Sequence, residues 1–380
     1  MTKPKIIRVV TDPFAVKYHM HNTLSRIDKD FEVLVVGQNV SQFSKQYKNV
    51  NFLDLNISRK VNLVSDICAV LGLIKIIVKF KPNIIHSLMP KASLISSIAG
   101  FLCRVPVRLH TFTGQVWATK SGISRYTFRK IDWLVNSLNT MCLTDSNSQS
   151  NFLYDNGIHK NRMPLPILIH GSLSGVDLER FNAKNLTNHS SGFKSALKLD
   201  SSHYVFAYVA RKTVDKGAID MLEAFHITYL KYNQARLLFI GPDEDGVIDK
   251  LRSSSPYLFE GVIEIGSVLN HEMYLNISNV LCLPSHREGF GSIVIDAAAL
   301  KMATIGTKIP GLVDAIVENE TGILTNLGDI PAFADSMLSC IEDPARINLL
   351  GIKAKERVDS FFGADNHYSA LKTFYLSFLN

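Results

Sequence analysis

Residues 281–300 join a strand-like apolar start, a turn with two glycines and a helix-like run of small residues. Gly289 and Gly291 have no side chain, so the backbone of this turn can approach a bound ligand closely. The amides of Gly291, Ser292 and Ile293 would open the helix, where N–H groups lack intrahelical acceptors and favour a phosphate. The pattern predicts a phosphate-binding turn between a strand and a helix.

Two acidic side chains flank this turn. Glu288 stands at the tip of the expected strand, and Asp296 follows eight positions later, inside the expected helix. Carboxylates on both sides of a phosphate site suit the hydroxyls of a sugar, which donate hydrogen bonds to them. The alternative is a capped helix in which the positive helix end favours Asp296. A dinucleotide fingerprint is not met, because Val294 occupies the position of its third glycine.

A second strand-to-helix loop, residues 209–217, carries the cations Arg211 and Lys216. An arginine can hold a phosphate through two N–H groups, and a lysine supplies a compact charge. Cations at such a loop stabilise the charge that develops on a nucleoside diphosphate leaving group. Alone, the loop is also compatible with a solvated basic surface. Its occurrence in the same half as the first motif favours a glycosyl-donor site.

Together these motifs resemble those of the retaining, metal-independent family 4 glycosyltransferases, which have the GT-B fold. The Glu-x7-Glu motif of that family is matched by Glu288 and Asp296, and its phosphate-binding pair by Arg211 and Lys216. The remaining matches are a linker signature, Ser174-Gly-Val-Asp177 with Phe181, and two later turn patterns, residues 304–311 and 320–324.

The resemblance implies a role for each matched residue. Glu288 would bind hydroxyls of the donor sugar, Asp296 would hold the ribose, and Arg211 and Lys216 would hold the diphosphate. The catalytic candidates are thus Glu288, Arg211 and Lys216, and the further donor-binding candidates are Gly266, Val268, Gly289, Gly291, Ser292 and Asp296. The resemblance also implies no cofactor, no divalent metal, and same-face attack in which the diphosphate helps to take the proton.

Three positions depart from the family pattern. Asp296 is one methylene shorter than the usual Glu, and the normally glycine-rich loop at residues 11–17 has no glycine. Thr113 stands where a pocket histidine is usual, and His110 lies three residues earlier. Lys17, His110 and Thr113 are therefore the candidates for the acceptor or sugar pocket. The donor sugar would meet His110, Thr113 or neither, since a histidine in a strand is also often structural. The Thr-Phe-Thr-Gly variant resembles bacterial surface-polysaccharide transferases of the O-antigen and capsule kind.

Alternating strands and helices must position these residues. In the first half the expected strands are 6–10, 31–36, 50–53, 83–86, 107–112 and 141–144, with helices at 19–27, 63–80, 92–102 and 126–136. In the second half the expected strands are 204–209, 236–240, 262–265, 280–283 and 303–305, with helices at 218–230, 292–300, 330–341 and 367–379. Such alternation predicts doubly wound parallel sheets with ligands beyond the carboxyl ends of the strands.

The predicted architecture is α/β, with two Rossmann-like domains of the GT-B type facing across a cleft. Residues 1–170 would bind the acceptor, residues 171–360 would bind the nucleotide sugar, and a helix at 361–380 would return toward the first domain. A stretch rich in proline, glycine and serine, residues 163–181, would connect the domains.

The charge of the chain is uneven. Residues 1–170 hold 22 Lys and Arg against 9 Asp and Glu, whereas residues 171–380 hold 19 against 25. The basic half could meet anionic lipid head groups or a pyrophosphate-bearing acceptor, and the alternative is plain solubilising charge. Basic and aromatic residues are mixed at 117–133, with Arg125 and Arg129 on one helical face. This segment gives the hypothesis of docking on an anionic membrane surface, against that of an amphipathic core helix. Nucleic acid is not an expected partner.

No segment predicts export or membrane insertion. The apolar run near the N-terminus, residues 6–10, is short, and the most hydrophobic window, residues 61–78, contains Asp66 and Lys75. The five cysteines lack paired spacing, which predicts reduced thiols. We therefore expect a cytoplasmic enzyme, peripheral at the inner face of the cell membrane.

The predicted reaction moves a sugar from a nucleotide-diphosphate sugar to a carbohydrate hydroxyl on a polyprenyl-diphosphate-linked acceptor, in polysaccharide or lipopolysaccharide synthesis. The alternative is a nucleotide-sugar epimerase or phosphorylase of the same fold.

Overall fold

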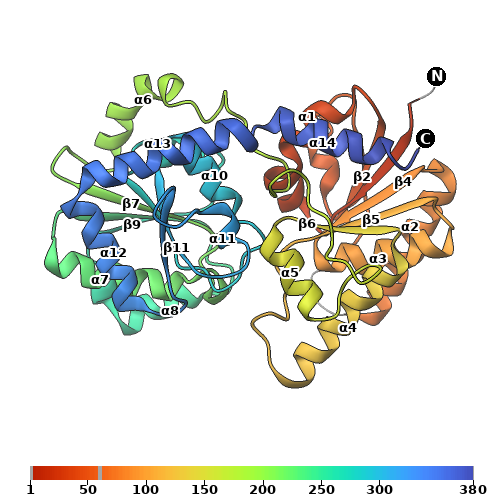
Figure 1. Ribbon diagram of the computed structural model, residues 1–380, viewed down its shortest axis with the longest axis horizontal. Coiled ribbons are helices and arrows are strands. Elements are labelled where there is room, and N and C mark those ends of the chain that lie inside the picture. Colours follow the sequence, from red (N-terminus) through yellow and green to blue (C-terminus); the bar gives the residue numbers. More distant parts are fainter. Residues whose placement is uncertain (1–2, 59–61, 380) are drawn as a thin grey trace. The chain divides into compact units, whose positions relative to one another are not determined.

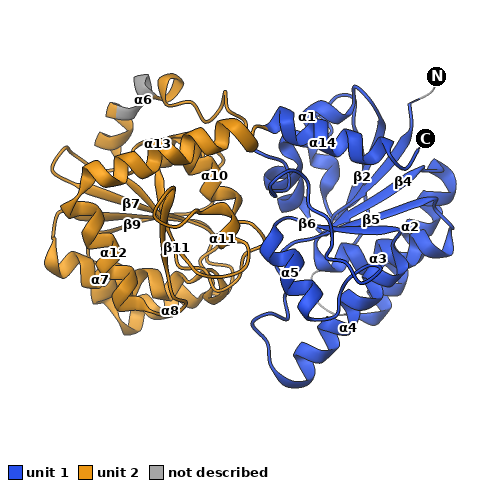
Figure 2. Ribbon diagram, in the orientation of Figure 1, with its two compact units in different colours: residues 1–175, 364–380 blue, residues 176–363 orange. Residues whose placement is uncertain are grey.

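Apolar, β-branched runs form the strands of two separate parallel sheets, one in each of two compact units of a computed structural model. The structure describes residues 3–58 and 62–379, so Val61 of the apolar window lies outside the described residues. The first unit comprises residues 1–175 and 364–380, and the second comprises residues 176–363 (Figure 2).

The first sheet contains six strands in the order β3-β2-β1-β4-β5-β6, all parallel. They are β1 (Lys5–Val9), β2 (Glu32–Gly37), β3 (Asn51–Asp54), β4 (Ile84–Leu88), β5 (Val107–Phe112) and β6 (Met141–Thr144). Alternate residues of β1 are buried on opposite faces, with Ile6 in one apolar cluster and Ile7 in the other. Both faces of this sheet are therefore covered by helices.

Helices of the first unit lie on both sides of its sheet (Figure 1). They are a π-helix η1 (Ala15–Met20), α1 (His21–Ile27), α2 (Leu63–Phe80), α3 (Pro90–Leu102), α4 (Gly122–Leu138), α5 (Asn147–Asp155) and α14 (Ala364–Leu376), with a short 3-10 turn η2 (Val40–Phe43). Leu371 and Tyr375 of α14 pack in the same cluster as Ile6, so the last helix belongs to the core of the first unit.

The second sheet has the order β12-β11-β10-β7-β8-β9, again all parallel. Its strands are β7 (Tyr204–Val209), β8 (Ala235–Ile240), β9 (Val262–Ile265), β10 (Val280–Leu283), β11 (Ala303–Thr307) and β12 (Gly322–Thr325). The chain builds outward from β7 to β9, then returns to the other side of β7 and builds outward from β10 to β12. The strand order therefore reverses between β7 and β10.

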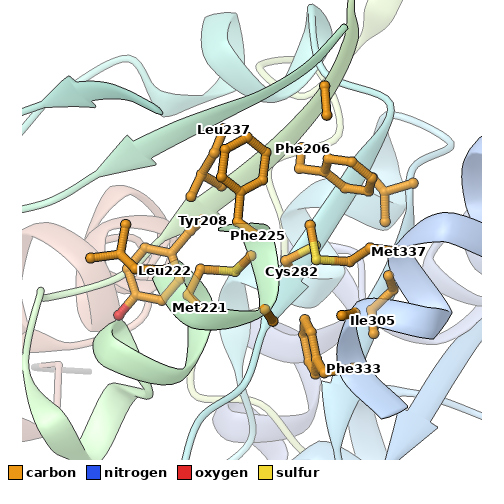
Figure 3. Close-up of a cluster of buried hydrophobic side chains, with 14 of the residues drawn as sticks. Phe206, Tyr208, Met221, Leu222, Phe225, Leu237, Cys282, Ile305, Phe333 and Met337 are labelled. Carbon is orange, nitrogen blue, oxygen red and sulfur yellow. The ribbon is translucent and has the colours of Figure 1, made fainter. Parts of the chain in front are cut away.

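The helices of the second unit cover both faces of its sheet. They are α6 (Ala183–Ala196), α7 (Ala218–Lys231), α8 (Val247–Ser254), α9 (His271–Asn276), α10 (Ser292–Ala299), α11 (Leu312–Ala315), α12 (Ile330–Glu342) and α13 (Pro344–Phe361), with 3-10 turns η3 (Val214–Lys216) and η4 (Pro256–Phe259). One face of the sheet packs against α7 and α12 through Phe225 and Phe333 (Figure 3). The other face packs against α10 and α13 through Ile295 and Val358.

The chain enters and leaves the second unit at one place. The amide of Val176 donates to the carbonyl of Phe362 at 2.7 Å, and Val176 also forms a parallel bridge with Gly363. The preceding segment, from the end of α5 to Gly175, contains no helix or strand. It is held by local hydrogen bonds, such as that from the Gly175 amide to the Ser172 hydroxyl at 3.2 Å.

Candidate active site

The predicted cations and carboxylates follow β7 and β10, the two strands between which the second sheet reverses its order. The loop after β7 runs to Gly217 and carries Arg211 and Lys216, and the loop after β10 runs to Gly291 and carries Glu288. Carboxyl ends of neighbouring parallel strands lie at the same edge of a sheet, and a reversal of strand order is where ligands of such sheets bind. The fold thus brings these side chains to one edge.

The loops around this edge pack backbone against backbone, and glycines permit it. Gly217 has a φ of +66°, and a Cβ there would lie 1.9 Å from the carbonyl oxygen of Pro284. Gly311, in the loop after β11, has a φ of +92°, and its Cβ would lie 2.5 Å from the carbonyl oxygen of Gly289. The loops after β7, β10 and β11 are therefore fixed against one another.

Replacing Gly217 by Ala is expected to lower the free energy of unfolding by about 2–3 kcal/mol, because strain at positive φ adds to a clash with Pro284. Gly246 offers a matched control, since its φ is +64° but a Cβ there meets nothing within 4 Å. Gly246→Ala is expected to cost only about 1 kcal/mol. Urea unfolding of both variants measures the difference, and equal losses would show that loop packing contributes nothing.

Lys216 and Glu288 form a direct ion pair. Lys216 Nζ lies 2.7 Å from Glu288 Oε1, with side chains that are 17% and 12% exposed. The Ser285 hydroxyl donates to the same carboxylate oxygen at 3.0 Å, and Lys216 Nζ also donates to the Arg287 carbonyl at 3.2 Å. The pair predicted to hold the diphosphate and the sugar is thus assembled within one hydrogen-bonded group.

Arg211 lies between two further carboxylates. One of its terminal nitrogens is 3.1 Å from Glu244, in the loop after β8, and the other is 3.6 Å from Asp215. Asp215 also accepts a hydrogen bond from Arg287 at 2.7 Å, and Arg287 precedes Glu288 in the chain. A continuous network of charges therefore connects Arg211 to the Lys216–Glu288 pair.

The network holds the Asp215 carboxylate in its charged form. Burial alone raises the pKa of Asp215, but the hydrogen bond from Thr213 and the charges of Arg287, Arg211 and Lys216 bring that pKa below its ordinary value. Asp215 is therefore a fixed negative partner of the cations at neutral pH.

Tyr208 contacts the backbone of the loop that carries Arg211 and Lys216. Its hydroxyl lies 2.9 Å from the carbonyl oxygen of Arg211 and 3.1 Å from that of Lys216. The ring is fully buried, and Figure 3 shows its oxygen at the edge of the apolar cluster. Burial raises the pKa of Tyr208 well above its ordinary value, so the hydroxyl stays protonated and can donate.

Asp296 has a different partner from the other three predicted residues. It lies in the second turn of α10, and its Oδ2 is 3.1 Å from Nε2 of His271, the first residue of α9. The structure therefore joins Arg211, Lys216 and Glu288 in one network and places Asp296 with His271 in the same unit.

The remaining donor candidates lie at the same carboxyl edge of the second sheet. Gly291 has a φ of +85° and immediately precedes α10, so the first amides of that helix follow the Glu288 loop. Ser292 is the first residue of that helix. Gly266 follows β9 and is exposed, whereas Val268 is half-buried against an apolar cluster that includes Leu199.

The three acceptor candidates lie in the first unit. Lys17 is on η1, with its Nζ 4.7 Å from the ring centre of Tyr18, and Thr113 is half-buried just after β5. His110 is buried inside the sheet, where its Nδ1 lies 3.0 Å from the Ser87 hydroxyl. Burial lowers the pKa of His110 to about 3, so the ring is neutral.

Two Asp-x-Asp pairs occur in the chain, residues 28–30 and 243–245. Asp30 is paired with Lys372 at 2.6 Å, and the Asp243 carboxylate accepts from the first amides of α8, including that of Ile248 at 3.1 Å. Among residues 3–58 and 62–379, no group of three or more His, Cys, Asp or Glu side chains is arranged to hold a metal ion.

The sequence analysis did not single out the partners of the predicted residues. These partners are Asp215, Glu244, Ser285 and Arg287 in the network and His271 beside Asp296. Asp215 and Arg287 adjoin predicted residues, so their position beside a motif was the available signal. Glu244 and His271 follow β8 and β9, and only the sheet order brings their loops near the predicted residues.

Two doubly wound parallel sheets, one with a charged network at its reversal point, define a protein of the GT-B class. The Anabaena protein HepE, solved in complex with UDP and glucose, superimposes with a TM-score of 0.82 at 14% sequence identity. The match covers 98% of this chain and 100% of HepE.

The chain belongs to the glycosyl transferases group 1 family. The family model matches residues 192–357, which include Arg211, Lys216, Glu288 and Asp296. The capsular polysaccharide biosynthesis glycosyltransferase CapM of Staphylococcus aureus is 30% identical over 359 residues, covering 92% of this chain and 91% of CapM. The Escherichia coli UDP-Gal:alpha-D-GlcNAc-diphosphoundecaprenol alpha-1,3-galactosyltransferase is 22% identical, covering 84% of this chain and 82% of that enzyme. The predicted family and fold class are thus confirmed.

Proposed function

We propose that this glycosyltransferase moves a sugar, with retention, from a nucleoside-diphosphate sugar to a hydroxyl of a lipid-linked saccharide. The observation that carries the proposal is the network of Arg211, Lys216 and Glu288 at the reversal point of the second sheet. Two cations beside a sugar-binding carboxylate suit a sugar diphosphate, because they offset its charge while the carboxylate accepts from sugar hydroxyls.

The residues have distinct roles in this proposal. Arg211 and Lys216 bind the diphosphate and stabilise the charge that it gains as the glycosidic bond breaks. Glu288 orients the sugar through its hydroxyls, and Asp296 binds the ribose. A diphosphate oxygen takes the proton of the acceptor hydroxyl on the face that the leaving group vacates, so the anomeric configuration is retained.

The relatives support a role in cell-surface polysaccharide synthesis. CapM is named for capsular polysaccharide, and the E. coli enzyme is named for a sugar acceptor on diphosphoundecaprenol. We extend this to capsule or O-antigen and other lipopolysaccharide synthesis, with a polyprenyl-diphosphate-linked acceptor. An epimerase or phosphorylase of the same fold is the less favoured alternative, because both relatives are transferases.

Thermal shift with UDP-, GDP-, ADP- and CDP-sugars tests the proposal, since a ligand at about 100 times its Kd adds about 2.7 kcal/mol of stability. We expect one donor to raise the melting temperature and to be consumed only when a saccharide acceptor is added. Turnover without acceptor would support the epimerase instead.

We also propose that Arg211 and Lys216 supply the positive charge without a metal, so EDTA should leave transfer unchanged.

Exposed apolar and basic side chains on α2 and α4 support peripheral membrane docking. On α2, Val64, Ile67, Leu71 and Val78 recur at helical spacing and are 54–73% exposed. On α4 the exposed large apolar residues include Ile123, Tyr126 and Trp133, and Lys130 Nζ lies 5.4 Å from the Tyr126 ring centre and 5.9 Å from that of Trp133. Helix α3 packs against both helices. No helix among the described residues has the length and apolar character to cross a bilayer.

Charge reversal on α4 is expected to weaken binding to anionic vesicles by about 30-fold or more. Each basic residue near such a surface contributes about 1 kcal/mol, and Arg125→Glu/Arg129→Glu changes two of them. Co-sedimentation with phosphatidylglycerol vesicles measures the loss. The control is Leu230→Glu, which places a negative charge at an apolar residue of the second unit that is 69% exposed. Unchanged binding of the α4 variant would remove that helix from the docking surface.

A further inference from the structure

The carboxylate assigned to the donor's ribose is held by a histidine outside the recognised motifs. His271 Nε2 lies 3.1 Å from Asp296 Oδ2, so α9 and α10 are joined at this point. An ionised carboxylate can only accept hydrogen bonds. The contact is a hydrogen bond in the tautomer that carries the ring proton on Nε2, where Nε2–H donates and Asp296 Oδ2 accepts.

The environment of His271 restricts its ring. The residue is 8% exposed, and its ring centre lies 5.2 Å from that of Phe181. The next residue, Glu272, is paired with Arg180 at 2.6 Å, which anchors the start of α9 to the segment that holds Phe181. His271 thus presents Nε2–H to Asp296 from a fixed position.

One oxygen of Asp296 remains for a ligand. The side chain is 19% exposed, and among residues 3–58 and 62–379 its carboxylate makes no hydrogen bond besides that from His271. Oδ1 can therefore accept from a hydroxyl that approaches from solvent. Because Oδ2 is already held, the carboxylate does not have to lose rotational freedom when the hydroxyl binds.

We propose that His271 is a positioning residue that orients Asp296 toward the 2′- and 3′-hydroxyls of a ribonucleoside diphosphate. The inference rests on the proposed function and deepens it, by making this pair the part of the site that selects ribose over deoxyribose. An aspartate has one methylene less than the glutamate usual at this place, so its reach depends more strongly on the direction in which it is held. His271 supplies that direction.

Nucleotide titrations of three variants test the proposal. The probe is whichever of UDP, GDP, ADP and CDP binds the wild type most tightly, together with its 2′-deoxy and 3′-deoxy forms. Because one hydrogen bond to a charged group is at stake, we expect the wild type to prefer the ribonucleotide by about tenfold. His271→Leu keeps the apolar bulk but removes the donor, and is expected to reduce this preference to about twofold. In His271→Gln the amide N–H can replace Nε2–H, so most of the preference should return.

A second histidine of the same unit supplies the control. His203 Nδ1 lies 3.2 Å from Asp200, just before β7 and thus at the opposite edge of the sheet. His203→Leu removes a comparable pair, so its ribose preference should equal that of the wild type. If His271→Leu does not fold, as judged by circular dichroism, His271→Asn replaces it, because its amide is too short to reach Asp296.

The possible results separate this inference from the proposed function. A ribose preference that survives in His271→Leu, or a wild type that binds nucleotides without preferring ribose, overturns the inference alone. If none of the four nucleoside diphosphates binds the wild type, the proposed function is wrong and the inference is overturned with it.

Discussion

Replacing Glu288 by Ala is expected to reduce sugar transfer by about 10²–10³-fold, with the fold retained. In the proposed function this carboxylate accepts from the donor sugar, and removing one preorganised hydrogen-bonding group from an active site costs about that much. The change also leaves Lys216 without the partner that lies 2.7 Å away in the free protein. Initial rates at saturating donor, with a melting curve of each variant, measure the effect.

Asp66→Ala provides the control for Glu288. Asp66 is paired with Lys91 in the first unit, and its side chain is 20% exposed. Its removal is expected to lower the melting temperature by a few degrees, as for Glu288, because both lose a partly buried ion pair. Transfer to a soluble acceptor should be unaffected. Full turnover by Glu288→Ala would remove this residue from the mechanism.

Replacing Arg211 by Ala is expected to weaken donor binding and slow transfer together. A charge-assisted hydrogen bond to a phosphate is worth about 1.5–3 kcal/mol, so Kd for the nucleoside diphosphate should rise about 10–100-fold. The loss in kcat/KM should be larger, because the leaving diphosphate gains charge in the transition state. The Kd and kcat/KM of Arg211→Lys should lie between those of the wild type and of Arg211→Ala, since lysine keeps the charge but not the paired N–H groups. Calorimetry and steady-state rates give both quantities.

Arg26→Ala provides the control for Arg211→Ala. The Arg211 side chain is 26% exposed and that of Arg26 is 21% exposed, and Arg26 is paired with Asp365 in the first unit. Arg26→Ala should change neither Kd nor kcat/KM. If Arg211→Ala raised only the KM of the acceptor, its assignment to the diphosphate would be wrong.

Strands and helices with strong apolar patterns could be predicted from the sequence. The bounds expected for β7 and α2, residues 204–209 and 63–80, are those of the structure. Helix α2 begins after Asn62, which accepts from the Ser65 amide, and ends at Phe80, with Lys81 as its cap just before Pro82, so both ends have a local signal.

Other elements lacked so simple a pattern. Helix α13 was not anticipated, although Asp343 caps it through the Arg346 amide and Pro344 opens it. Its buried face contains Gly351 as well as larger residues, because that turn lies against the backbone of Lys301, where a Cβ would be 2.0 Å from the carbonyl oxygen. Tertiary packing, rather than local propensity, therefore fixes this helix.

The candidate site could be proposed from residue types in the sequence, but its contacts could not. Arg211, Lys216 and Glu288 stand out because charges beside glycines follow apolar strands. Glu244 stands in the loop after β8, and Arg287 reaches Asp215 from the loop after β10, so both contacts depend on which strands are neighbours, and periodicity does not contain that information. For the same reason the pairing of Asp296 with His271 could not be inferred from spacing.

A crystal structure of the complex with a nucleoside diphosphate tests directly whether Arg211 and Lys216 bind the diphosphate. We expect diphosphate oxygens within hydrogen-bond distance of the Arg211 and Lys216 side chains, between the loops that follow β7 and β10. A diphosphate bound instead at the carboxyl edge of the first sheet, on Lys17 and the residues around it, would show that the second sheet does not hold the donor site.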